Sequence, residues 1–317
     1  MSASNAPSRQ SAARPSMPRV LRLLGLAPLP IAHLFGACIG VIAWAFSASY
    51  RRKLDTNMAQ AGYRPGAVRR QAIVQAGRMI AECPWVWTHH PRAVIRKVLL
   101  SSTEALEIAE QRGRGVLILT PHLGAFEVAA RFYAARRPIT VLYKPPKIDF
   151  VRRWLEAARS ADGVTAVPPT IGGLRTMLRT LRRGDIVGLL PDQVPTEGDG
   201  EWANFFGKPA YTMTLPQRLT EMTGCTVVLA TAERLSLGRG WRLHFEVLPD
   251  VPTPAVVNAR FEGLIQRMPG QYLWGYNRYK LPPGVAAADA GMVVAEAQPD
   301  VVELTNEPDL RHKLPQQ

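Results

Sequence analysis

The sequence predicts an α/β fold with a mainly parallel central sheet flanked by helices, together with an N-terminal hydrophobic membrane helix. Two observations lead to this prediction. From residue 116 onward, short apolar runs alternate with longer amphipathic segments, which is the pattern of parallel strands joined by helices. Residues 23–46 contain no Asp, Glu, Lys or Arg, over about the length that a helix needs to cross the hydrocarbon core.

Composition divides the chain into four parts. Residues 1–20 are rich in Ser, Ala, Pro and Arg and are predicted to be a disordered, basic N-terminus. Residues 21–50 form the hydrophobic segment, and residues 51–284 form the α/β domain. Residues 285–317 are rich in Ala, Asp and Glu with little periodicity, which predicts a mobile C-terminal tail.

The hydrophobic segment has the flanks of a membrane anchor. Trp44 and Tyr50 lie near one end, where amphipathic aromatic side chains anchor at the interface. The length of the apolar run and the lack of a small-residue cleavage site argue against a signal peptide, and a buried core helix is the other alternative. Pro28 and Pro30 place the start of the helix near Ile31, so a full span and a shallow insertion both stay open. Basic residues flank the segment on both sides: Arg19, Arg22, Arg51, Arg52 and Lys53.

Periodicity gives the elements of the α/β domain in order. Strands are expected at 116–120, 139–143, 164–167, 186–190, 227–234 and 241–247. Helices are expected at 63–87 (broken by Pro65 and Pro84), 95–112, 125–135, 149–160, 173–183, 215–223 and 254–268.

Net charge and cysteine content limit the kinds of partner, metal site and compartment that the sequence indicates. The formal net charge is +14, but the basic residues are scattered as pairs, and the chain has no zinc finger, RNP aromatic signature or basic zipper. We therefore expect an anionic membrane surface rather than nucleic acid. The three cysteines have no CxxC or disulfide-like spacing, so they indicate neither a metal site nor a redox site and fit a reducing compartment.

The stretch PHLGAFE predicts a reaction centre. His122 follows a buried strand, where α/β enzymes place their chemistry, and histidine suits general base catalysis near neutral pH. On one continuous helix His122 and Glu127 would lie about 140° apart. They can meet if His122 lies in a turn and Glu127 in the first turn of the next helix, which predicts an imidazole base oriented by Glu127. The alternative is an ordinary structural His–acid pair.

A second strand ends in the same way. Leu190-Pro191-Asp192 repeats the arrangement of Thr120-Pro121-His122, so His122 and Asp192 are predicted to share the carboxyl edge of a parallel sheet. Pro-Asp is equally typical of a simple turn, and the sequence does not decide between the two interpretations.

Taken in order, these blocks resemble the bacterial lipid A biosynthesis acyltransferases, the late or secondary acyltransferases of lipopolysaccharide assembly that include lauroyl- and myristoyltransferases. The resemblance runs from about Pro30 to Pro283. It rests on the apolar segment, the basic stretch at 51–57, PHLGAFE, YKPPK (143–147), GDIVGLLPDQ (184–193), FFGKPA (205–210) and PGQYLWGYNRYK (269–280).

The resemblance implies a role for six residues. The family's HxxxxD/E motif falls on His122 and Glu127, and the Pro-Asp block on Asp192. A family arginine falls on Arg159. Lys144 stands where the family commonly has Arg, which keeps the charge but loses the bidentate fork. The closing motif lacks the usual His, so Arg278 (with Lys280) is left as the basic contact. Arg159, Asp192, Lys144 and Arg278 are thus expected to bind substrate.

The implied activity is that of an enzyme with a glycerolipid acyltransferase-like fold. It would move a fatty acyl chain from acyl carrier protein, or less often coenzyme A, to a hydroxyl of a lipid A precursor, without metal or other cofactor. The implied location is the bacterial inner membrane, with the acyltransferase domain on the cytoplasmic side among the membrane lipids. Two alternatives stay open: an acyltransferase for another glycerophospholipid or glycolipid, and a non-catalytic lipid- or carrier-binding membrane protein.

Overall fold

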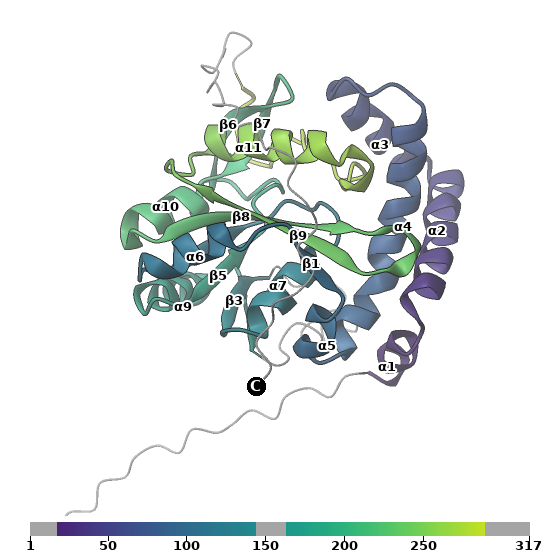
Figure 1. Cartoon of the computed structure of the whole chain (residues 1–317). Coiled ribbons are helices and arrows are strands. Elements are labelled where there is room, and N and C mark those ends of the chain that lie inside the picture. Colours follow the sequence, from purple (N-terminus) through teal and green to yellow (C-terminus); the bar gives the residue numbers. More distant parts are fainter. Residues whose placement is uncertain (1–17, 144–162, 289–317) are drawn as a thin grey trace, which may run out of the picture.

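The computed structural model describes residues 18–143 and 163–288 (Figure 1). A seven-stranded sheet runs through it in the order β1-β9-β8-β2-β5-β3-β4, and all neighbouring strands are parallel except β8 and β9. The strands are β1 Val98–Leu100, β2 Val116–Leu119, β3 Ile139–Leu142, β4 Val164–Val167, β5 Ile186–Leu189, β8 Thr226–Arg234 and β9 Trp241–Leu248. The prediction of a mainly parallel α/β sheet is confirmed.

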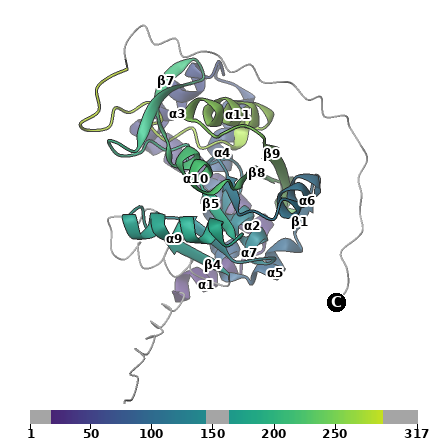
Figure 2. The ribbon, with the colours of Figure 1, turned by 90° about the vertical axis from the view of Figure 1, so that its left-hand side faces the viewer.

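Helices cover both faces of this sheet (Figures 1 and 2). They are α1 Arg19–Gly25, α2 Leu29–Phe46, α3 Ala48–Gln60, α4 Ala67–Thr88, α5 Pro91–Ile95, α6 Glu104–Gln111, α7 Phe126–Ala134, α9 Ile171–Arg182, α10 Leu215–Thr223 and α11 Pro254–Arg267. Two 3-10 turns, η1 Ser236–Gly238 and η2 Pro269–Gln271, and a separate antiparallel hairpin of β6 Gly200–Phe205 and β7 Lys208–Met213 complete the described residues.

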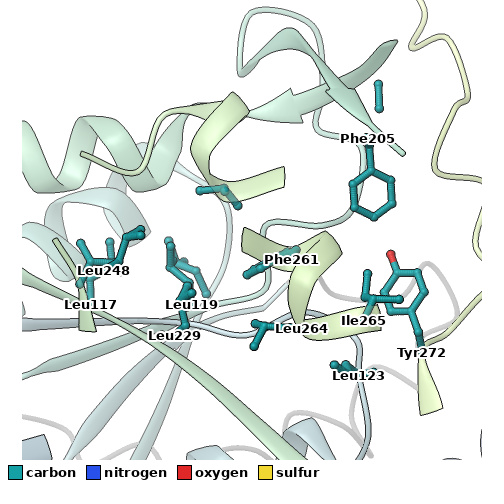
Figure 3. Close-up of a cluster of buried hydrophobic side chains, with 14 of the residues drawn as sticks. Leu117, Leu119, Leu123, Phe205, Leu229, Leu248, Phe261, Leu264, Ile265 and Tyr272 are labelled. Atoms are coloured by element: carbon teal, nitrogen blue, oxygen red, sulfur yellow. The ribbon is translucent and has the colours of Figure 1, made fainter. Parts of the chain in front are cut away.

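The strand residues alternate between two cores. Leu117 and Leu119 of β2 join the core beneath α9, α10 and α11, whereas Val116 and Ile118 join the core with α6 and α7. Side chains at alternate positions of a strand point to opposite faces, so a central strand covered on both sides needs an unbroken apolar run. Figure 3 shows the first core, in which side chains of α11 lie over those of β2 and β8 and Tyr272 lies beside Ile265 and Leu123.

Three sequence expectations differ from the structure. Residues 95–112 form β1 and α6 rather than one helix, because Ser101, Ser102 and Thr103 interrupt the run and the Ser102 hydroxyl accepts from the amide of Glu104. Pro84 does not break α4, although it cannot donate to the Ile80 carbonyl. The carbonyl of Pro84 accepts from the Thr88 hydroxyl at 2.7 Å. The β6–β7 hairpin was not predicted. The predicted helix at 149–160, most of the basic N-terminus and most of the C-terminal tail lie outside the described residues.

The hydrophobic segment forms α1 and α2, joined at Pro28. By length and composition α2 could cross a membrane, although a core helix or signal sequence would pass the same test. One face of α2 packs closely on α4. A Cβ at Gly40 would lie 2.2 Å from the Ile73 carbonyl oxygen, and one at Gly77 would lie 1.9 Å from that of Gly36.

The opposite face of α1 and α2 is apolar and exposed. Its large exposed residues are Val20, Leu23, Leu24, Leu26, Ile31, Leu34, Phe35, Val41, Ile42 and Phe46. A contiguous apolar surface of this kind is typical of a membrane or protein contact.

A buried charge cluster ties α2 to the sheet. Glu82 of α4 pairs with Arg234 at the end of β8, and it also accepts from Trp241 Nε1 at 3.0 Å. His33 of α2 lies 3.0 Å from the same carboxylate. Charges this deeply buried are tolerated only when they are paired and hydrogen-bonded, so the cluster specifies how the apolar helix packs on the domain.

Candidate active site

Sheet register brings His122 and Asp192 together. β2 and β5 are parallel neighbours in which Leu119 pairs with Leu189, and the amide of Thr120 donates to the carbonyl of Leu189. His122 and Asp192 follow these paired residues by the same number of positions. The two side chains therefore meet beyond the carboxyl edge of the sheet, as the repeated strand endings predict.

Asp192 holds the imidazole through two hydrogen bonds. Its Oδ1 lies 2.6 Å from His122 Nδ1, and its Oδ2 accepts from the His122 amide at 2.8 Å. The Asp192 side chain is 3% exposed and that of His122 is 17% exposed. Burial alone would raise the pKa of Asp192, but the contacts with His122 outweigh it and lower that pKa. Asp192 is therefore ionised and fixes His122 with Nε2 as the nitrogen left for chemistry.

Tyr272 supports Asp192 from within the core. Burial, followed by the charge of Asp192 close by, raises the pKa of Tyr272 well above its ordinary value. The phenol is therefore protonated beside the carboxylate. Tyr272 lies far from His122 and Asp192 in the sequence and among other aromatic residues, so the sequence analysis did not identify it as a site residue.

The expected substrate contact at Arg278 is wrong. Arg278 is 2% exposed, and its guanidinium donates to the Tyr211 carbonyl, the Thr212 hydroxyl and the Asn258 amide oxygen. It also lies over the ring of Phe205. A cation packed in this way stabilises the joint between the β6–β7 hairpin and α11 and is closed to a ligand. Lys280, two residues later, is exposed and lines the pocket.

The expected pairing of His122 with Glu127 is also corrected. His122 lies in the turn and Glu127 in the first turn of α7, as predicted, but the partner of Nδ1 is Asp192. The carboxylate of Glu127 instead accepts from Trp87 Nε1 at 3.1 Å and lines the same pocket. The path of the chain explains the difference, because the turn points the imidazole across the sheet edge toward β5. The ring of Phe126 packs edge-on against the imidazole, with the ring centroids 4.9 Å apart.

The turn that contains His122 is held by backbone contacts. Gly124 adopts φ +63°, and a Cβ there would lie 2.0 Å from the Ala232 carbonyl oxygen, so only glycine fits this position. The amide of Gly124 donates to the Gln271 carbonyl and that of Ala125 to the Ala232 carbonyl. Arg234 Nη2 donates to the Gly124 carbonyl at 3.1 Å, which links the turn to the buried charge cluster.

Gln193 is the polar neighbour of the reactive nitrogen. Its Nε2 lies 3.2 Å from His122 Nε2, and both side chains line the pocket. A neutral imidazole that donates from Nδ1 accepts at Nε2, so the carboxamide of Gln193 donates to the lone pair that a base would use. The PDQ block contains this residue, and its position directly after Asp192 was the signal that could have identified it.

The pocket in front of His122 has a volume of about 870 Å³. Its polar lining includes His122, Glu127, Gln193, Asp199, Arg218, Tyr276 and Lys280. Its apolar lining comes from the strand ends and from two helices that face each other, α9 and α10: Val141, Leu142, Leu174, Met177, Leu215, Leu219 and Met222. A pocket that combines an imidazole with many apolar side chains suits a substrate with a polar head and a hydrocarbon chain.

Two predicted substrate contacts, Lys144 and Arg159, lie outside the described residues. Across 18–143 and 163–288, no group of three or more His, Cys, Asp and Glu side chains could hold a metal ion. Catalysis without a cofactor stays a prediction.

Comparison with known proteins identifies the family of this chain. A sequence profile of the family described as "Bacterial lipid A biosynthesis acyltransferase" matches residues 18–281. The lipid A biosynthesis lauroyltransferase of Escherichia coli (strain K12) is 24% identical over 282 residues, covering 83% of this chain and 90% of that protein. The lipid A biosynthesis palmitoleoyltransferase of the same strain is 25% identical over 283 residues, with the same coverage. The chain therefore belongs to the family of bacterial lipid A biosynthesis acyltransferases.

Proposed function

We propose that this enzyme transfers a fatty acyl chain from acyl carrier protein, or from coenzyme A, to a hydroxyl group of a lipid A precursor. The observation that carries the proposal is the His122–Asp192 pair, whose free nitrogen faces an apolar pocket in a chain of this family. The exposed apolar face of α1 and α2 supports attachment to the inner membrane, where the acceptor lipid would lie, with the acyltransferase domain on the cytoplasmic side.

In the proposed reaction His122 Nε2 removes the proton from the acceptor hydroxyl as its oxygen attacks the thioester carbonyl. Asp192 keeps Nδ1 protonated and stabilises the imidazolium that forms. When the tetrahedral intermediate collapses, the C–S bond breaks and His122 returns the proton to the departing thiolate. The products are an ester and a free thiol, and the base is regenerated.

The apolar part of the pocket is the proposed site of the acyl chain. Leu174 and Met177 of α9 face Leu215 and Leu219 of α10, so a chain lying between the two helices would have its carboxyl end at His122. Burying each methylene is worth about 0.8 kcal/mol, which makes this contact the main source of donor binding energy. Lys144 and Arg159 stay predicted phosphate contacts because of the family resemblance.

Gln193 is the proposed donor to the oxyanion. The amides of Gly124 and Ala125, which an oxyanion site at this turn would use, already donate to carbonyl groups. When the acceptor hydroxyl donates its hydrogen bond to Nε2, it replaces the carboxamide of Gln193. The carboxamide is then left next to the reacting carbon. We therefore assign transition-state stabilisation to Gln193, together with the amide of Phe126 at the start of α7.

Replacing Gln193 with alanine is expected to lower kcat about 10²–10³-fold, the usual cost of losing one oxyanion donor. The KM values should change little, because the contact forms in the transition state. Steady-state kinetics with the purified enzyme test this, with Thr196→Ala, at the exposed edge of the same pocket, as the control. An unchanged kcat would remove Gln193 from the mechanism.

Mass spectrometry of the reaction products tests the proposed function. The purified enzyme, acyl carrier protein carrying one defined acyl chain, and a lipid A precursor should give a lipid heavier by one acyl group, together with free carrier thiol. Modification of only a glycerophospholipid or another glycolipid would replace the acceptor in the proposal. Binding of the carrier with no loss of thioester would indicate a non-catalytic binding protein.

A further inference from the structure

Helix α9 has two chemically different faces. Leu174 and Met177 point into the pocket, whereas Arg175, Arg179 and Arg182 are exposed on the outer side. The three arginines are spaced by four and three residues, so they lie within about 60° of one another around the helix axis. They form a cationic stripe, which we call the α9 arginine stripe (Arg175, Arg179 and Arg182).

The ion pairs next to α9 do not include the stripe arginines in the described part of the chain. Arg183 pairs with Asp185 at 3.3 Å, and Arg137 lies 3.6 Å from the same carboxylate. Within the residues that the structure describes, none of the three stripe arginines forms an ion pair. Arg179 Nε donates to the carbonyl of Arg175, an uncharged group that does not neutralise the guanidinium. Three like charges on one short helix repel each other, so a partner with negative charge would relieve that repulsion.

The stripe lies on the helix whose other face lines the pocket. Ile171, at the start of α9, lines the pocket and is 72% exposed. Arg218 of α10 adds another cation to the pocket wall. A partner bound to the outer face of α9 could therefore insert an acyl chain between α9 and α10 without crossing the rest of the molecule.

The position of the stripe favours a soluble partner over the membrane. Figure 1 shows α2 and α9 on opposite sides of the molecule, and Figure 2 shows α9 toward the viewer with α2 behind. The exposed apolar face is on α1 and α2, which pack on α4. A bilayer that covers this face cannot at the same time reach the outer side of α9.

We infer that the α9 arginine stripe is the docking surface for an acidic protein that presents the acyl thioester to the pocket. The inference rests on the proposed function, because it identifies where the donor of that reaction binds. Electrostatic docking of this kind acts mainly on the association rate and is sensitive to salt. A donor without a protein part should therefore not need the stripe.

The test compares two donors with the full-length enzyme in detergent, one on acyl carrier protein and one as uncharged acyl-pantetheine. The double variant Arg175→Glu/Arg179→Glu should raise the KM for the carrier-borne donor at least about tenfold at low salt, with kcat nearly unchanged. Its kinetics with acyl-pantetheine should match those of the unaltered enzyme. Arg92→Glu/Arg96→Glu, in α5 and at its C-cap, is the matched control, since these exposed arginines have the same spacing and the same charge change.

Each remaining outcome has a distinct meaning. Equal losses with both donors would show that the substitutions damage the pocket, and would overturn the docking surface. Unchanged kinetics with the carrier, or a loss confined to binding of anionic phospholipid vesicles, would also overturn it. If the unaltered enzyme transfers from neither donor, the proposed function itself fails.

Discussion

Replacing His122 with alanine is expected to lower the rate of acyl transfer by about 10²–10⁴-fold, the usual contribution of a general base. The acceptor hydroxyl is a poor nucleophile while it keeps its proton, and His122 Nε2 is the imidazole nitrogen that faces the pocket. The variant should still fold, because the side chain is partly exposed and the turn is held by backbone contacts of Gly124 and Ala125.

The control for this variant is His244→Ala. His244 also lies near a carboxylate, that of Glu233 at 3.4 Å, but on β9 and away from the pocket. Initial rates with a defined acyl donor, and thermal unfolding of both variants, separate loss of chemistry from loss of fold. Near-normal turnover by a folded His122→Ala enzyme would refute the assignment of the base.

Replacing Asp192 with asparagine is expected to reduce kcat by about 10⁴-fold, as for other triads in which the carboxylate becomes an amide. The amide can donate to Nδ1, which places the imidazole proton on Nε2 and removes the base. It also removes the negative charge that stabilises the imidazolium. Because the amide oxygen introduced by Asp192→Asn can still accept from the His122 amide, the buried site keeps its shape while its charge changes.

Asp199→Asn serves as the comparison for this effect. Asp199 lines the same pocket, but it is exposed and bonds to the Thr196 hydroxyl rather than to His122. It should leave kcat close to that of the unaltered enzyme in single-turnover measurements. Equal losses for Asp192→Asn and Asp199→Asn would indicate a general effect of charge in the pocket rather than a specific role of Asp192.

Much of the sheet follows from local patterns in the sequence. Runs such as those of β2 and β5 are apolar at every position, and α9, α10 and α11 have clear amphipathic periods, so these elements were predicted to within about two residues of their ends. The β6–β7 hairpin carries little local apolar pattern. It is held by long-range contacts such as those of Arg278 with Tyr211 and Thr212, which periodicity does not reveal.

Local patterns in the sequence also predicted part of the candidate site. The repeated Pro-His and Pro-Asp endings placed His122 and Asp192 at one edge, and the parallel register of β2 and β5 confirmed that expectation. Which acid holds the imidazole depends on the direction of the turn, which is set by the contacts of Gly124 with Ala232 and Gln271. Spacing along the chain favoured Glu127 because it contains no information about these distant contacts.

The most direct test is the ratio of the single-turnover transfer rates of Asp192→Asn and Glu127→Gln, measured side by side. We predict that Asp192→Asn loses about 10⁴-fold. Glu127→Gln, which keeps an oxygen acceptor for Trp87 and leaves the His122–Asp192 contact in place, should lose less than Asp192→Asn. A greater loss in Glu127→Gln than in Asp192→Asn would contradict the His122–Asp192 pair as the catalytic base.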